Sequence, residues 1–255
     1  MAMTRSRLLL AFALLTASGL PARADPPAQS RQDVMALDAE AALRRMSKAL
    51  ATAPAFMLRI NTLREVRLPN GQPVLLGAST ALAARRPDHL VASVGSDLGN
   101  FDLWYDGRRV TLLKPIENIH AASLLTGDLQ AVLDWLEDRI GIQIPVRPIF
   151  AADPYAALLE AGPTTGFHVG RSYVQEVEVD HFALRNPEAS WEIRLEANDR
   201  ALPRRVSVVQ PADAGPPRVT LALDDWNLSP QLADGSFSFV PPPGAVPATP
   251  ILRPE

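Results

Sequence analysis

The sequence has no cysteine among its 255 residues, which excludes disulfides, thiolate metal sites, a cysteine nucleophile and a lipid-modified N-terminal cysteine. A large excess of one charge is also lacking. The 25 basic and 28 acidic side chains give a net charge of −3, which offers no electrostatic basis for binding nucleic acid. Long apolar runs are lacking after residue 20, so we expect the protein not to be integral to a membrane.

Motifs for catalysis are lacking as well. No Gly-x-Ser-x-Gly, Gly-x-x-x-x-Gly-Lys or Gly-x-Gly-x-x-Gly segment is present, and the 4 histidines have no zinc-ligand spacing. Asp180 and His181 are neighbours, but adjacent residues of a strand point to opposite faces and do not pair. We therefore expect no metal, no cofactor and no enzymatic activity, with an uncharacterised hydrolase as the less favoured alternative.

Proline, in contrast, is abundant. The 24 prolines are about 9% of the chain, against a usual share of about 5%. Because proline breaks helix interiors and is tolerated at turns and strand ends, this composition excludes a helical bundle and favours a fold of many strands.

The first 24 residues read as a signal peptide. Arg5 and Arg7 precede an apolar run of about 13 residues, too short for a transmembrane anchor, and Ala22-Arg23-Ala24 gives a small-x-small cleavage site. Removing three arginines leaves a net charge of 22 − 28 = −6. We expect export to the periplasm, with residues 25–32 as a disordered lead-in.

The rest of the chain predicts one domain of about ten strands over residues 33–246, followed by a tail at 247–255. A helix is expected over Val34–Thr52, capped by Asp33 and stopped by Pro54. From Phe56 the apolar period becomes two, as in strands. Strands are expected at Phe56–Leu68, Val74–Ala84, Leu90–Val94, Phe101–Tyr105, Val110–Lys114, Val177–Leu184, Ser190–Glu196, Arg204–Gln210, Val219–Trp226 and Ser236–Val240.

The middle of the chain, about residues 116–170, predicts a helical insert. Its main helix has an apolar stripe at helical spacing, formed by Leu129, Val132, Leu133, Leu136 and Ile140. Gly141 is placed to end this helix, and a second helix is expected after Asp153-Pro154. The stripe predicts either a helix packed permanently on the sheet or a movable lid between Gly127 and Gly141. Trp135 lies off the stripe.

The first strand carries the candidate cavity. Phe56, Leu58, Ile60 and Val66 share its apolar face, and Arg64 falls on that face if the strand has no bulge. A buried guanidinium without a partner is costly, so Arg64 either anchors a polar group inside an apolar cavity or is turned outward by a bulge.

Several short motifs give the chain a resemblance to a known family. They are Arg86-Pro87-Asp88, Tyr105-Asp106-Gly107, Asp180 to Arg185, Leu202 to Arg205 and Phe237 to Ala245. In this order they resemble a bacterial family of predicted periplasmic proteins classified only as a domain of unknown function. That family is similar to the superfamily of LolA-like and LolB-like lipoprotein carriers.

The resemblance implies a mainly β (α+β) fold, a half-open antiparallel β-barrel whose concave face is covered by helices. It also implies an apolar concave face that receives acyl chains, with an inward arginine holding the lid shut, a part that Arg64 would play. The leading hypothesis is a periplasmic, non-enzymatic carrier of a hydrophobic ligand or lipoprotein acyl chain. The alternative is an envelope docking or regulatory protein that binds a protein partner and no lipid.

Overall fold

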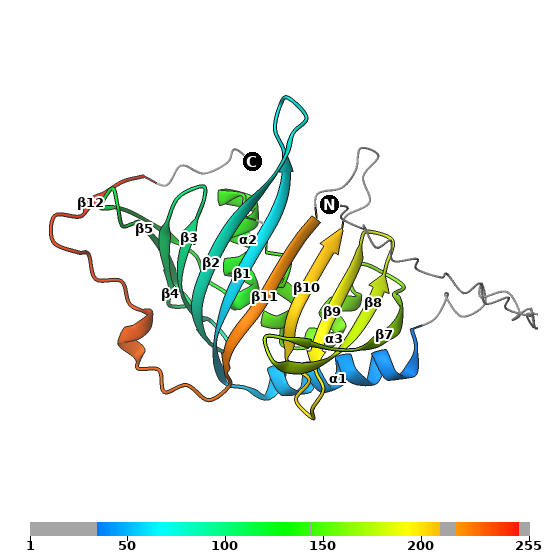
Figure 1. Ribbon diagram of the computed structural model, residues 1–255. Coiled ribbons are helices and arrows are strands. Elements are labelled where there is room, and N and C mark those ends of the chain that lie inside the picture. Colours follow the sequence, from blue (N-terminus) through cyan, green and yellow to red (C-terminus); the bar gives the residue numbers. More distant parts are fainter. Residues whose placement is uncertain (1–34, 143, 210–217, 250–255) are drawn as a thin grey trace, which may run out of the picture.

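A single curved sheet dominates the computed structural model, which describes residues 35–142, 144–209 and 218–249 (Figure 1). In the described residues the sheet has twelve strands in the order β12-β6-β5-β4-β3-β2-β1-β11-β10-β9-β8-β7. Every neighbouring pair is antiparallel except β12 with β6. The expected fold class, a mainly β protein with a half-open antiparallel sheet, an N-terminal helix and a helical insert, is confirmed.

Two meanders form the sheet and meet at its centre. The first contains β1 (Ala55–Arg67), β2 (Pro73–Arg85), β3 (His89–Ser96), β4 (Phe101–Tyr105), β5 (Arg109–Lys114) and β6 (Ile119–Leu124). The second contains β7 (Thr165–Val174), β8 (Val177–Arg185), β9 (Ser190–Glu196), β10 (Pro203–Val209) and β11 (Arg218–Asn227). Strand β1 pairs with β11, so the first strand of the chain joins the two halves.

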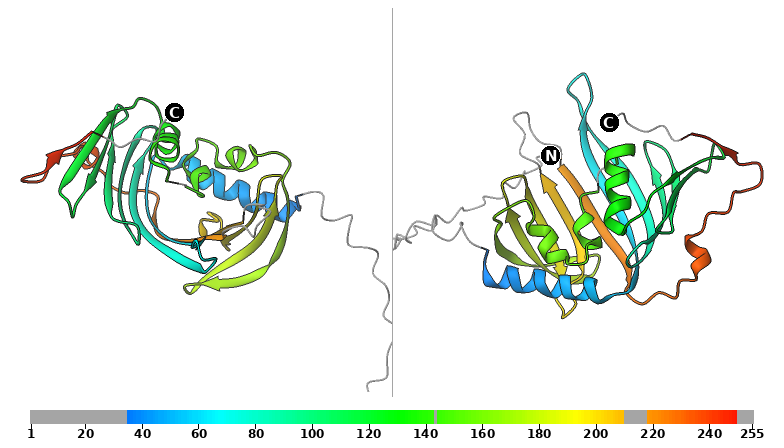
Figure 2. Two further views of the ribbon diagram at one scale, coloured as in Figure 1. Left: turned by 90° about the horizontal axis from the view of Figure 1, so that it is seen from above. Right: turned by 180° about the vertical axis from the view of Figure 1, so that it is seen from behind.

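The helices lie together on the concave face of the sheet (Figure 2). They are α1 (Leu37–Thr52), α2 (Leu129–Trp135), the π-helix η2 (Leu136–Ile140), the 3₁₀ helix η3 (Arg147–Phe150) and α3 (Pro154–Leu159). Helix α1 is amphipathic, and Leu43, Met46 and Leu50 are buried along one side of it. The hydrophobic core therefore fills the space between these helices and the inner side chains of the strands.

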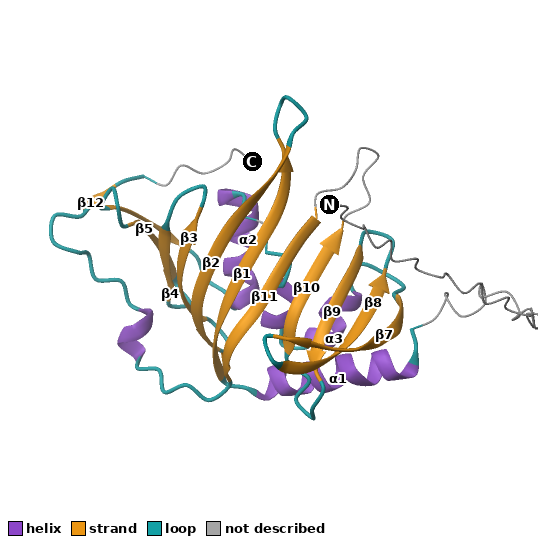
Figure 3. Cartoon of the chain, in the orientation of Figure 1, coloured by secondary structure: helices purple, strands orange, loops and turns teal. Residues whose placement is uncertain are grey.

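The C-terminal segment crosses to the convex side of the sheet (Figures 1 and 3). We call residues 228–249 the strap. It contains the 3₁₀ helix η4 (Asp234–Phe237) and ends in β12 (Val246–Pro247), which pairs with the outer edge of β6. The prediction of a strand over Ser236–Val240 was wrong. The alternating Phe237 and Phe239 pack as anchors against the convex face, without ladder pairing.

Other boundaries also differ from the sequence-based expectations. Three strands were missed: β6, β7 and the short β12. As a result the helical part of the insert spans 129–159, and strands take both ends of the expected 116–170. Helix α1 begins at Leu37, and its N-cap residue, Ala36, makes no side-chain cap. The expected cap Asp33, the signal peptide and the lead-in lie outside the described residues.

Candidate ligand-binding site

Three of the predicted cavity residues are packed in the core. Phe56, Leu58 and Ile60 point from β1 toward the helices, and the solvent-exposed fraction of each is 6% or less. The ring of Phe56 lies 5.6 Å from that of Phe150 in η3. These residues belong to the same cluster as the predicted lid residues, so the fold brings the two sets together.

Arg64 and Val66 lie on the same face, further along β1. The pairing of β1 with β2 runs from Ala55 to Arg67 without a register shift, so no bulge turns Arg64 away from the side of Ile60. The single irregularity of the pairing with β11 lies earlier, between Met57 and Arg59. Arg64 and Val66 are half-buried, as are Val74 and Leu76 on the same face of β2.

The expected lid helix forms, with a change of geometry in its middle. Asp128 caps α2 by accepting the backbone N–H groups of Gln130 and Ala131. The helix continues as the π-helix η2 and ends at Gly141, whose positive φ of 84° suits glycine. Four stripe residues are buried against the sheet, and Ile140 is half-buried beside them: Leu129, Val132, Leu133, Leu136 and Ile140. We call residues 129–142 and 144–146 the cover.

Arg147 ties the cover together from its C-terminal side. Its guanidinium forms ion pairs with Asp134 and Glu137, the latter at 3.1 Å, and donates a hydrogen bond to the side chain of Gln130. Glu137 also accepts the backbone N–H of Ile144 at 2.9 Å. These contacts close the cover on itself through charge-assisted bonds, which are stronger than neutral ones.

The N-terminal side of the cover is held by two neighbouring turns of the sheet. The hydroxyl of Tyr105 donates to the carbonyl oxygen of Gly127 at 2.7 Å, and the backbone N–H of Leu129 donates to Pro87 at 2.8 Å. Tyr105 is fully buried, and burial, followed by the charge of Asp88, raises its pKa to about 12. The phenol therefore stays a neutral donor over the physiological pH range.

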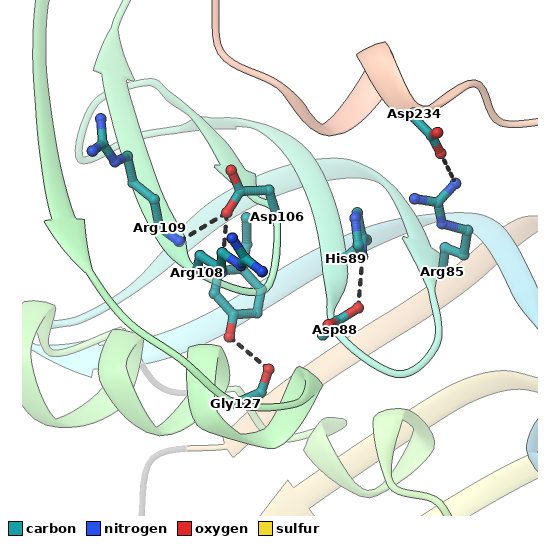
Figure 4. A network of polar contacts seen from close by, with 9 residues as sticks. Arg85, Asp88, His89, Asp106, Arg108, Arg109, Gly127 and Asp234 are labelled. Atoms are coloured by element: carbon teal, nitrogen blue, oxygen red, sulfur yellow. Dashed lines mark hydrogen bonds and ion pairs between the residues drawn. The ribbon is translucent and has the colours of Figure 1, made fainter.

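Three of the sequence motifs meet at these turns, which the sequence alone did not reveal. Figure 4 shows two of them, at Asp88 and Asp106, with Asp234 of the strap nearby. The turn at Gly107 packs on the carboxylate of Asp88, so a Cβ at Gly107 would lie 2.6 Å from an oxygen of Asp88. Asp88 in turn contacts the ring of His89 at 2.6 Å. His89 packs edge-on against Phe237 of the strap, at 5.1 Å between ring centroids.

The same cluster binds α1, η3 and the strap. Arg86 donates to the carbonyl oxygens of Phe150, Leu50 and Ile149, and its burial lowers its pKa. Arg85 forms an ion pair with Asp234 at 2.6 Å. The cluster is therefore a junction where the helices of the concave face and the strap of the convex face meet the sheet.

The convex face of the sheet carries a hollow that the sequence did not predict. It measures about 510 Å³ and lies over β1 to β4, where small side chains such as Ala81 and Ser93 stand between Met57 and Trp104. Its rim includes the ion pair of Arg59 with Asp225, at 3.3 Å. The predicted cavity residues Phe56 and Ile60 point to the opposite face.

The histidines contact carboxylates in pairs other than the one considered from the sequence. Asp180 lies 3.3 Å from His168, and His181 lies 3.1 Å from Glu192. Burial, followed by the charge of Arg194, lowers the pKa of His181. Within the described ranges, no group of three acidic or histidine side chains is arranged to hold a metal ion, and no helix is long and apolar enough to span a membrane.

Comparison with models of protein families identifies the family to which the chain belongs. The model of the predicted periplasmic proteins of DUF2092 matches residues 39–249. The chain belongs to this family. The resemblance noted in the sequence is thereby confirmed, and the family's description as periplasmic agrees with the export expected from residues 1–24. No curated protein matches the DUF2092 protein in sequence.

Solved structures with which the DUF2092 protein can be aligned are distant. MucB is 14% identical with a TM-score of 0.44, and the alignment covers 80% of this chain but only 64% of MucB. A LolA superfamily protein from Nitrosomonas europaea is 10% identical with a TM-score of 0.40, covering 78% and 97% of the two chains. The lipoprotein LppX of Mycobacterium tuberculosis is 12% identical with a TM-score of 0.39, covering 75% and 97%.

Proposed function

We propose that this DUF2092 protein is a periplasmic, non-enzymatic binding protein that holds a hydrophobic or acylated ligand on the concave face, beneath the cover. The observation that carries the proposal is a gradient of burial along β1. Phe56, Leu58 and Ile60 are buried, whereas Arg64 and Val66, on the same face, are only half-buried. The inner face of β1 thus continues beyond the packed core, on the side of the sheet against which the cover packs.

A ligand enters beneath the cover only if the cover moves, and this movement exposes buried side chains at a cost in free energy. Leu129, Val132, Leu133 and Leu136 are all buried. Exposing four such side chains costs roughly 6–12 kcal/mol, at about 1.5–3 kcal/mol each. An acyl chain of about 16 carbons gains about 12 kcal/mol gross on leaving water, before ordering costs. The ligand therefore offsets the opening of the cover when most of its chain is buried.

Tryptophan fluorescence tests the proposal, because three of the four tryptophans lie in or beneath the cover, Trp135, Trp191 and Trp226, and Trp104 alone lines the convex hollow. We expect brominated palmitate to quench the wild-type fluorescence. The quenching should be reduced in Trp135→Phe, with a remainder from Trp191 and Trp226, and should persist undiminished in Trp104→Phe. The proposal is wrong if palmitate does not quench at all, or if only Trp104→Phe abolishes the effect.

A charged cover residue provides an independent check. Leu133→Asp places a carboxylate on the buried stripe and should abolish palmitate binding, whereas Asp138→Asn on the exposed side should retain it. Circular dichroism confirms that each variant is folded. Undiminished binding by a folded Leu133→Asp variant would contradict a ligand site under the cover.

A second candidate function, docking of a protein partner, is favoured by the edge of the sheet. Strand β7 ends the strand order of the described sheet, and Phe167, Val169 and Tyr173 are exposed on it. Long apolar edge strands favour pairing with another chain. A stoichiometric protein partner that is lost in Val169→Pro, together with no bound lipid, would favour this function over ligand carriage.

A further inference from the structure

A second hollow lies on the convex side, between the strap and the turn that joins β4 to β5. It measures about 420 Å³. It is lined by Asp106, Arg108, Arg109, Thr111, Leu124, Phe237, Ser238 and Phe239. The strap therefore forms one wall, and β5, β6 and their neighbouring turn form the other.

Four residues that line the hollow carry hydrogen-bond donors that have no acceptor among the described residues. Neither guanidinium, of Arg108 or of Arg109, forms an ion pair or hydrogen bond with any described residue. The hydroxyl of Thr111 is also without a hydrogen bond there, although this residue is only 4% exposed. Ser238 adds a hydroxyl in the same situation. Neither hydroxyl is among the buried polar atoms that lack a partner, so both remain open to solvent or to a bound ligand.

The one carboxylate in the lining is already engaged. An oxygen of Asp106 accepts the backbone N–H groups of Arg108 and Arg109, at 3.0 and 2.8 Å. This bonding fixes the turn, and the carboxylate forms no ion pair with the exposed guanidinium of Arg108 or Arg109. The lining therefore has a net charge of +1, in a protein whose net charge is −3.

The remaining walls are apolar and rigid. Phe237 is 1% exposed, and the guanidinium carbon of Arg85 lies 4.9 Å from its ring centroid. The ring of Phe239 lies 5.0 Å from both Trp104 and His120. These contacts keep the strap wall in place, so the hollow does not depend on an unanchored segment.

We propose that this hollow binds the phosphoryl group of an organic phosphate ester. Guanidinium groups match phosphate oxygens in a bidentate geometry, and two arginines with two hydroxyls supply more donors than the two oxygens of a carboxylate accept. The aromatic walls and the volume of the hollow leave room for an organic body beside the phosphate. The site lies on the face of the sheet opposite to the cover, so its test is independent of the test of the proposed carriage function.

Calorimetric titration of the purified protein tests this site with three probes: inorganic phosphate, glycerol 3-phosphate and monomeric short-chain phosphatidylglycerol. We expect Arg108→Ser/Arg109→Ser to weaken binding of the organic esters by about tenfold or more. Arg185→Ser/Arg200→Ser removes the same charge at exposed positions elsewhere and should leave binding within about twofold of the wild type. Binding of glycerol 3-phosphate identifies a soluble ester, and binding of the lipid alone identifies a headgroup.

The proposal is overturned if no probe binds with a Kd below about 1 mM, or if both double variants weaken binding equally. It is also overturned if inorganic phosphate binds as tightly as the esters, because the apolar walls would then contribute nothing. Thr111→Val provides a second test that leaves the charge unchanged and nearly conserves volume. We expect it to weaken ester binding about threefold, and unaltered binding would contradict the role of the hydroxyl.

Discussion

The hydroxyl of Tyr105 donates a hydrogen bond to the carbonyl oxygen of Gly127, 2.7 Å away, and so links the end of β4 to the start of the cover. A second polar bond at this end joins the backbone N–H of Leu129 to the carbonyl oxygen of Pro87. Both bonds lie at the N-terminal end of the helix, whereas the contacts of Arg147 lie on its C-terminal side, so a different substitution tests each end.

Tyr105→Phe is expected to loosen the cover. The substitution keeps the buried ring and removes one hydrogen bond, which costs about 1 kcal/mol. We expect amide hydrogen exchange to accelerate about fivefold in residues 129–140 and to stay unchanged in α1. The exposed Tyr173→Phe serves as the control. Equal protection of the cover in both variants would show that this bond does not restrain it.

Arg147→Gln should free the C-terminal side of the cover. The change removes the ion pairs with Asp134 and Glu137, which are partly exposed and together contribute about 1 kcal/mol. Palmitate should then bind with a faster association rate in stopped-flow fluorescence, while Arg45→Gln, on the exposed side of α1, leaves the rate unchanged. A rate that does not change in Arg147→Gln argues against opening at this end.

Gly107→Ala should destabilise the fold more than Gly71→Ala does. The two glycines have nearly the same positive φ, 82° and 83°, so the backbone strain of an alanine is matched. Only at Gly107 does the added Cβ meet a neighbour, the carboxylate of Asp88 at 2.6 Å. Urea denaturation should show an additional loss of about 1 kcal/mol or more in Gly107→Ala. Equal losses would mean that Asp88 moves aside freely.

Phe237→Ala should release the strap from the convex face. Its ring is buried between His89 and Arg85, and removing a buried phenylalanine side chain costs about 3–5 kcal/mol. Limited proteolysis should then cut within 228–249, while Val240→Ala, at an exposed position, leaves the strap protected. A protected strap in Phe237→Ala would show that β12 and Phe239 suffice to hold it.

The stability of the protein should depend on pH through His181. Its folded-state pKa is lowered, by burial first and by Arg194 second, so the unfolded chain binds a proton that the folded chain resists. Stability is therefore lost as the pH falls below about 6.5 toward the folded pKa. His181→Gln should flatten the dependence of Tm on pH between about 5 and 7. An unchanged slope would assign the acid sensitivity to other groups.

The sequence predicted the elements whose apolar period is unbroken. The alternation of Phe56, Leu58 and Ile60 gave the inner face of β1, and the stripe from Leu129 to Ile140 gave the helix of the cover. Strands β6 and β7, next to one end of the sheet and at the other, were missed because the ends of a sheet bury little. Ile119, Leu124, Phe167 and Tyr173 are all exposed, so the apolar period carries no information there.

The junction of turns was beyond reach for a different reason. Gly107, Asp88 and Phe237 are far apart in the sequence, and only the pairing order of the sheet brings them together. Their motifs supported the family resemblance without indicating contact. The two hollows on the convex face depend on the path of the strap and on small side chains from several strands, and periodicity in one strand does not report either.

The seam between β1 and β11 has a consequence for the order of folding. Residues 57–64 pair with residues 219–227, across more than half of the chain, whereas the other pairings within each meander join strands that are neighbours in sequence. The short β12 adds a second distant pairing, with β6. Each meander can therefore assemble locally as soon as its strands are available, but the two halves can join only after β11 has emerged. Closing so long a loop is slow, and the seam is where a chaperone that delays pairing would have its greatest effect.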